Sequence, residues 1–292
     1  MAALDYLLWF QELRYNVPLI ETVAILFSSR AFYLVLPFMV AAALFWYKGH
    51  RDGFLIAMGL TFASVAAETI KGAVAEPRPW ELDSRIDMVE GVHQSGYSFP
   101  SGHTAMVFSS LVPAGLISRD RMVLTLLVCV STVVVVSRLV LCCHTYVDVL
   151  GGAATGLAVS LCCWYGIRLS ERGEVWFHGV TLAFLVCSVA GMSAMSLVGR
   201  MDVDDLLLRT GFVVGITVSR ELDHRYGRDL PLGSGICDRF KSYLLGMAVA
   251  AVLFVAPAVA IPPVGAAIGA ALIMVWCFFA YPELYLRRAS SC

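Results

Sequence analysis

Residues 97–104 read Tyr-Ser-Phe-Pro-Ser-Gly-His-Thr, between a polar loop and a long apolar run. Pro100 favours extended backbone before it, Ser101 is a good N-cap, and Gly102 lets a ligand approach the first turn of a helix. Free N–H groups at such a helix start attract an anion such as phosphate, and His103 would lie beside it. An ordinary helix cap requires the same residues, so the string alone does not establish a ligand site.

Two further polar clusters stand at the ends of apolar segments. Residues 71–79 read Lys-Gly-Ala-Val-Ala-Glu-Pro-Arg-Pro, and residues 137–148 read Ser-Arg-Leu-Val-Leu-Cys-Cys-His-Thr-Tyr-Val-Asp. Together with Pro-Ser-Gly-His they resemble the pattern of the type 2 phosphatidic acid phosphatase (PAP2) superfamily, which is related to glucose-6-phosphatase and vanadium haloperoxidases. That pattern is Lys, six residues, Arg-Pro; then Pro-Ser-Gly-His; then Ser-Arg, five residues, His, three residues, Asp. Every signature position is filled in order.

The resemblance implies a role for each signature residue. His144 would be the nucleophile, Asp148 its orienting partner, and His103 the general acid that protonates the leaving group. Five residues would hold the phosphate: Lys71, Arg78, Ser101, Gly102 and Arg138. Such a set fits phosphoryl transfer, in which catalysis is mostly positioning and electrostatic stabilisation. The expected chemistry uses no metal and no cofactor.

Residue type and spacing alone also indicate a functional role at two places: the pair His144 and Asp148, and Arg138. His144 and Asp148 are four apart, so on a helical turn they would share a face and the carboxylate could accept from the imidazole. The other ring nitrogen would then be free to attack phosphorus, although a satisfied polar pair at an interface explains the spacing equally well. Arg138 stands between two apolar runs, where a charge needs a partner. For Arg85 and Arg200 we expect snorkelling to lipid headgroups.

The composition indicates a membrane protein. Of the 292 residues 59% are apolar and 15% charged, with a mean hydropathy of +0.77, whereas globular chains carry about 25% charged residues. The net charge of −1 does not favour nucleic-acid binding, which usually requires an excess of positive charge. The nine cysteines lack the spacing of a zinc site or a secreted disulfide scaffold. The first residues have neither the basic region nor the cleavage site of a signal peptide.

The hydropathy pattern predicts an all-α polytopic membrane protein with about nine transmembrane helices around a PAP2-type core. We expect an interfacial or re-entrant segment over residues 1–30, a catalytic core over residues 31–170, and a four-helix membrane extension over residues 171–292. The expected spans are residues 31–47, 54–71, 102–118, 122–138, 147–167, 175–198, 206–218, 242–261 and 264–281. Gly-x-x-x-Gly strings at residues 152–156, 211–215 and 265–269 could allow close helix packing.

The basic residues predict an orientation. Thirteen of the 21 Lys and Arg residues fall on one side of the expected spans, and the other eight include Lys71, Arg78 and Arg138. By the positive-inside rule the thirteen face the cytoplasm. The site would then lie on the outer or periplasmic face of the cell (inner) membrane.

The sequence therefore predicts an integral membrane phosphatase that hydrolyses a lipid phosphate or an isoprenoid (polyprenyl) diphosphate through a phosphohistidine intermediate. Its expected partners are that substrate and the membrane lipids, not nucleic acid, and the oligomeric state is left open. Three alternatives remain at this point: a phosphatase of a soluble sugar phosphate, a vanadate-dependent peroxidase, and a non-catalytic lipid-phosphate binder.

Overall fold

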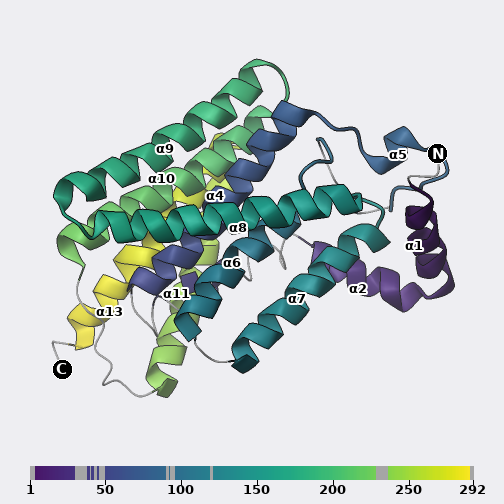
Figure 1. Ribbon diagram of the computed structural model, residues 1–292. Helices are drawn as coiled ribbons and strands as arrows, with labels where there is room; N and C mark the ends of the chain where they lie inside the picture. The colour runs from purple at the N-terminus through teal and green to yellow at the C-terminus, as the bar shows by residue number, and fades with distance from the viewer. Residues whose placement is uncertain are drawn as a thin grey trace.

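The computed structural model describes residues 4–29, 38–39, 41–42, 45, 50–89, 92, 96–118, 121–227 and 236–289. The regular elements are α1 (Asp5–Asn16), α2 (Pro18–Ser28), α4 (His50–Val74), α5 (Pro79–Leu82), α6 (Gly102–Ser118), α7 (Arg121–Val140), α8 (Tyr146–Ser170), α9 (Glu174–Leu197), α10 (Val203–Tyr226), α11 (Ile236–Ala260), α12 (Val264–Val275), the π-helix η3 (Trp276–Ala280) and α13 (Tyr281–Ala289). Within these ranges every regular element is helical, as predicted. The long helices lie side by side, with α1 and α2 at one end of the bundle (Figure 1).

Five helices in the described part of the chain are long and apolar enough to cross a membrane. They are His50–Leu82, Tyr146–Ser170, Glu174–Leu197, Lys241–Ala260 and Val264–Tyr285. The expected count of nine is therefore not confirmed. Helix α6 has only 17 residues, and α10 begins with two aspartates in its first turn. The first expected span, residues 31–47, lies mostly outside the described residues.

Glycines bring α6 and α8 into backbone contact at the end that carries the motifs. A methyl group added at Gly152 would lie 2.4 Å from the carbonyl oxygen of Ser101, and one at Gly156 would lie 2.2 Å from that of Ala105. No side chain fits at either glycine, so the predicted close packing is confirmed. The contact places the starts of both helices together, and the Ser101 amide donates to the Asp148 carbonyl at 2.9 Å.

The other two glycine strings join the C-terminal helices in the same way. A methyl group at Gly211 of α10 would lie 2.1 Å from the carbonyl oxygen of Ala267 in α12. One at Gly269 of α12 would lie 2.6 Å from that of Phe254 in α11. Helices α10, α11 and α12 therefore form a tightly packed group, as both strings predict.

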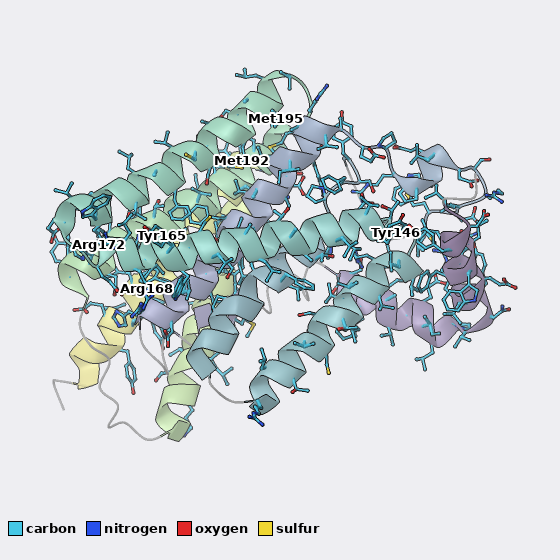
Figure 2. All side chains as sticks on the ribbon, in the orientation of Figure 1. Tyr146, Tyr165, Arg168, Arg172, Met192 and Met195 are labelled. Carbon is cyan, nitrogen blue, oxygen red and sulfur yellow. The ribbon has the colours of Figure 1, made fainter. Side chains whose placement is uncertain are left out.

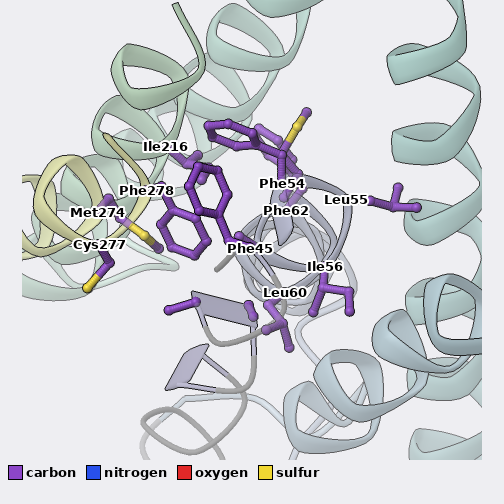
Figure 3. Close-up of a cluster of buried hydrophobic side chains, with 14 of the residues drawn as sticks. Phe45, Phe54, Leu55, Ile56, Leu60, Phe62, Ile216, Met274, Cys277 and Phe278 are labelled. Atoms are coloured by element: carbon purple, nitrogen blue, oxygen red, sulfur yellow. The ribbon is translucent and has the colours of Figure 1, made fainter. Parts of the chain in front are cut away.

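A buried aromatic cluster connects this group to the N-terminal half (Figure 3). The Phe45 ring meets Phe54 of α4 edge-on with centroids 5.3 Å apart, and meets Phe278 of η3 edge-on at 5.5 Å. Ile216 of α10 is buried in the same cluster. Such aromatic pairs contribute about 0.5–1.5 kcal/mol each beyond the area they bury. The core therefore spans the expected boundary at residue 170.

Helices α1 and α2 pack over the end of α7 and the segment after α5. Leu7 is buried with Ile86 and Cys142, and Arg14 Nη2 donates to the Asp87 carbonyl at 3.0 Å. These contacts cover the connection between α7 and α8, which carries part of the third motif. The interfacial or re-entrant location of residues 1–30 stays a prediction.

The two arginines expected to snorkel have contacts within the protein, and their snorkelling stays a prediction. Arg85 Nη2 lies 2.7 Å from Asp83 Oδ2 and 2.9 Å from Asp5 Oδ1. Arg200 Nη1 donates at 3.2 Å to the carbonyl of Gly72, at the C-terminal end of α4. Arg85 therefore pairs with nearby carboxylates, and Arg200 with helix-end carbonyls that have no intrahelical partner, while both residues stay exposed.

The glycine contact between α6 and α8 predicts a difference between two alanine substitutions. Gly156→Ala should lower the stability by about 1–3 kcal/mol, because the methyl group forces the two backbones apart. Gly179→Ala, in α9, meets nothing within 4 Å, and should be neutral or slightly stabilising because alanine is the better helix former. Thermal unfolding of both purified variants in detergent is the measurement. Equal melting temperatures would contradict the packing argument.

Candidate active site

The three motif stretches meet at one end of the bundle. Lys71 lies in the last turn of α4, Arg78 at the N-cap of α5, Arg138 in the last turn of α7, and the remaining residues at the starts of α6 and α8. Figure 2 shows this end of α8 at Tyr146, far from Arg168 and Arg172 at the other end. The predicted side chains are all buried, with exposed fractions of 7% for Lys71, 2% for Arg78, 0% for Ser101, 8% for His103, 0% for Arg138, 0% for His144 and 2% for Asp148.

Asp148 is fixed by the start of α8. Its Oδ2 accepts from the Thr145 amide at 2.6 Å and from Ser98 Oγ at 2.6 Å. Thr145 Oγ1 accepts in return from the Asp148 amide at 3.2 Å, so the two residues form a capping box. His144 precedes this cap and is not on the helix, which corrects the expected shared helical face. The imidazole Nδ1 nevertheless lies 3.7 Å from Asp148 Oδ2.

The surroundings of His144 determine which ring nitrogen carries the proton. Nε2 lies 3.2 Å from Arg78 Nη1, and a guanidinium can only donate. Nε2 therefore presents its lone pair to Arg78, and the ring proton is on Nδ1, toward Asp148. Arg78 is held in place by donating from Nη1 to the Cys143 carbonyl and from Nε to the Gly96 carbonyl, each at 3.0 Å. This is the tautomer that a nucleophilic histidine requires.

Burial lowers the pKa of His144, because an imidazolium loses hydration inside the protein. The positive charges of Arg78 and Lys71 lower the pKa further, and Asp148 acts in the opposite direction. The lowering prevails, so the ring is neutral at physiological pH.

His103 lies between an acceptor and a donor. Its Nε2 is 3.3 Å from the Ser28 carbonyl oxygen and 3.5 Å from Arg138 Nη1. Arg138 also donates from Nε and Nη2 to Ser137 Oγ, each at 3.3 Å. Ser28 ends α2, so the N-terminal helices contribute directly to the site.

The start of α6 faces Lys71. The Ser101 carbonyl accepts from the Ala105 amide at 3.0 Å, and Ser101 Oγ accepts from Thr104 Oγ1 at 3.0 Å. A methyl group added at Gly102 would lie 3.8 Å from Lys71 Nζ. The positive end of the helix therefore adjoins an ammonium group, and this combination favours an anion.

Three residues that contact the predicted set were missed by sequence reasoning. Glu68 accepts from Lys71 at 2.9 Å, Ser98 donates to Asp148, and the Ser28 carbonyl oxygen lies 3.3 Å from His103 Nε2. The sequence could have indicated Glu68, because it is a carboxylate within an apolar segment, three residues before Lys71. An ionisable residue in such a segment is a candidate functional residue by default. Nothing in the sequence indicated Ser98 or Ser28. Within the described ranges, no group of three or more His, Cys, Asp or Glu side chains is placed to hold a metal ion.

Comparison with known proteins agrees with the resemblance in the motifs. Residues 52–172 match the family model of the PAP2 superfamily. The chain is also similar to phosphatidylglycerophosphatase B of Bacillus subtilis (strain 168), with 29% identity over 140 residues. The match covers 44% of this chain and 65% of that relative. No solved structure matches the chain. This match over residues 52–172 agrees with the resemblance to the PAP2 superfamily that the motifs carry.

The site geometry predicts how His144 responds to pH. Between pH 8 and pH 5.5 its ring should remain neutral with the proton on Nδ1, because burial and two neighbouring cations disfavour the imidazolium. Nitrogen-15 NMR of histidine-labelled protein measures this directly, and the His144→Gln variant identifies the signal by its disappearance. A titration midpoint near the ordinary histidine value of about 6.5, or a proton on Nε2, would contradict the assignment.

Proposed function

We propose that the chain is an integral membrane phosphatase that hydrolyses a lipid phosphate through a phosphohistidine intermediate on His144, without a metal. The observation that carries the proposal is the position of buried His144, with Nε2 3.2 Å from Arg78 Nη1 and Nδ1 3.7 Å from Asp148 Oδ2. The match to the PAP2 superfamily model and the printed name of the Bacillus relative support the phosphatase class and a lipid substrate.

In the first step His144 Nε2 attacks phosphorus and the bond from phosphorus to the ester oxygen breaks. His103 enters this step as the imidazolium and gives its proton to the departing alkoxide, so a neutral alcohol leaves and a neutral imidazole remains. The phosphoryl group stays on His144, whose ring becomes positively charged. Asp148 stabilises this charge through the Nδ1 proton.

In the second step His103 removes a proton from water, and the hydroxide attacks phosphorus. The nitrogen–phosphorus bond breaks, its electron pair returns to His144 Nε2, and inorganic phosphate is released. In both steps Lys71, Arg78, Arg138 and the amide of Gly102 stabilise the phosphoryl oxygens. These groups already lie at the site before a substrate binds, which lowers the cost of reorganisation.

A cavity beside the site supports a lipid substrate. It has a volume of about 600 Å³ and includes Asp148 and Thr145 in its lining. Its other lining residues are mostly apolar: Leu4, Tyr6, Val74, Leu82, Phe99, Tyr146 and Val147, with Glu76 and Asp83. An acyl or prenyl chain could pack against this surface, whereas a sugar would leave its hydroxyl groups facing apolar side chains.

We also propose that the site faces the outer or periplasmic side of the cell membrane. The excess of basic residues supports this orientation by the positive-inside rule. Arg168 and Arg172 belong to that excess and lie at the end of α8 opposite the site (Figure 2).

Substitution of the nucleophile tests the mechanism. His144→Ala should reduce phosphate release at least about a thousandfold, because no other group replaces the attacking nitrogen. Asp148→Asn should reduce phosphate release less, because it affects the orientation of the His144 ring and the stabilisation of its charge but leaves the nucleophile in place. His178→Ala is the matched control, because that histidine lies half-exposed on α9 and pairs with Glu174.

The same assay includes EDTA and vanadate. Activity should persist in excess EDTA, and vanadate should inhibit because it can accept His144 as a fifth ligand and imitate the transition state. Near-normal phosphate release by His144→Ala, or activity lost to EDTA and restored by magnesium, would contradict the histidine mechanism.

The apolar cavity predicts a dependence on chain length. For a series of alkyl phosphates of increasing length, kcat/KM should rise, because each additional buried methylene contributes about 0.8 kcal/mol. Glucose 6-phosphate and glycerol phosphate serve as the soluble comparison. A higher kcat/KM for a soluble sugar phosphate than for the longest alkyl phosphate would favour a sugar phosphatase.

A further inference from the structure

We propose that Glu68 and Arg209 are positioning residues for Lys71, so that the C-terminal helices take part in binding phosphate. Glu68 lies on α4 one turn before Lys71, and Arg209 lies on α10, outside the region that matches the PAP2 family. The inference rests on the proposed function, because it concerns a residue assigned there to phosphate.

One oxygen atom of Glu68 contacts both Lys71 and Arg209. Glu68 Oε1 accepts from Lys71 Nζ at 2.9 Å and lies 3.4 Å from Arg209 Nη2. Arg209 Nη1 lies 2.7 Å from Oδ1 of Asp205, one turn earlier on α10. The side chains of Lys71, Glu68 and Arg209 are mostly buried, with 9%, 19% and 17% exposed. A chain of charged contacts therefore runs from α10 to Lys71.

Lys71 is close to where the phosphate would bind. A methyl group at Gly102, in the first turn of α6, would be 3.8 Å from Lys71 Nζ and 3.7 Å from Glu68 Oε1. The ammonium group and its carboxylate partner therefore both adjoin the helix start that favours an anion. The contact with Glu68 sets where the ammonium group lies before a substrate arrives.

Arg209, the second cation beside Glu68, explains how Lys71 can leave Glu68 and contact a phosphate. If Glu68 were paired with Lys71 alone, a phosphate that drew the lysine away would leave a mostly buried carboxylate without a counter-ion, which is costly. Arg209 lies against the same oxygen and keeps Glu68 paired. Lys71 can then contribute its charge to the phosphate at a lower cost.

The backbone that carries Lys71 is also held by the C-terminal half. Arg200 Nη1 donates to the carbonyls of Gly72 and Ala73 at 3.2 and 3.3 Å. A methyl group at Gly72 would lie 2.9 Å from the side chain of Met195, which Figure 2 shows on α9 near the end of α4. The last turn of α4 is thus fixed by α9 and by the segment between α9 and α10.

Two substitutions of Arg209 test the proposal. Arg209→Gln should weaken the binding of orthovanadate about tenfold, the order expected when one charged contact between coupled residues is lost. It should raise KM more than it lowers kcat, and Arg209→Lys should restore part of the affinity. Arg225→Gln is the matched control, because Arg225 is also on α10 and pairs with a carboxylate, Glu221, at 2.7 Å, but is mostly exposed. Its vanadate affinity should equal that of the unchanged protein.

A double-mutant cycle separates positioning from a structural role. In a Lys71→Met background, Arg209→Gln should change vanadate affinity less than twofold, because the residue on which it acts is gone. Isothermal titration calorimetry with vanadate and the full-length protein in detergent is the measurement. An equal loss in both backgrounds would show a general effect on the fold and overturn the proposal.

The outcomes distinguish this proposal from the proposed function. If the unchanged protein binds vanadate but hydrolyses no lipid phosphate, the proposed function fails, and the vanadate affinities still decide the role of Arg209. If the unchanged protein hydrolyses lipid phosphate and Arg209→Gln has the same vanadate affinity and KM, the positioning proposal fails alone. Absence of vanadate binding to the unchanged protein would overturn both.

Discussion

Every buried charge at the candidate active site needs a partner within the protein. Arg138 and Arg78 are almost completely buried, and Lys71 and Asp148 are nearly so. A buried charge without a partner costs several kcal/mol, so each of these groups has contacts within the protein. Arg78 contacts two carbonyls and His144, Asp148 accepts from Ser98 and a backbone amide, and Lys71 is paired with Glu68. These contacts hold helix ends and loops together before any substrate is present.

Helix packing places these groups within reach of one another. The glycines of α8 allow α6 to approach so closely that the first turns of both helices share a backbone hydrogen bond. His103 and Asp148 therefore belong to one rigid unit, while Lys71 and Arg138 reach it from the ends of α4 and α7. Helices α1 and α2 complete the arrangement, with the Ser28 carbonyl against His103.

The sequence predicted which residues come together at the site, but not all of the contacts between them. The eight motif residues could be predicted because they fill the PAP2 pattern in order, and the structure brings them together at one end of the bundle, while their roles stay predictions. The contact between Glu68 and Arg209 could not be found, because it joins helices 141 residues apart along the chain and depends on tertiary packing. The shared helical face of His144 and Asp148 was wrong because Thr145 caps α8 between them. The count of nine spans is not confirmed, because residues 31–47 lie mostly outside the described residues, α6 is at the lower limit of length with 17 residues, and α10 carries several charges.

In the proposed mechanism the phosphoryl group is transferred to Nε2 of His144 before it reaches water. The most direct measurement uses the His103→Ala variant with an aryl phosphate, whose leaving group needs no proton, so that the first step proceeds and the second is slow. After an alkaline quench, which preserves phosphohistidine, the protein is digested and its peptides are analysed by mass spectrometry. We expect a phosphoryl group on His144, and it should be absent when His144→Ala is added. A phosphoryl group on another residue, or turnover with no covalent intermediate at any time point, would contradict this mechanism.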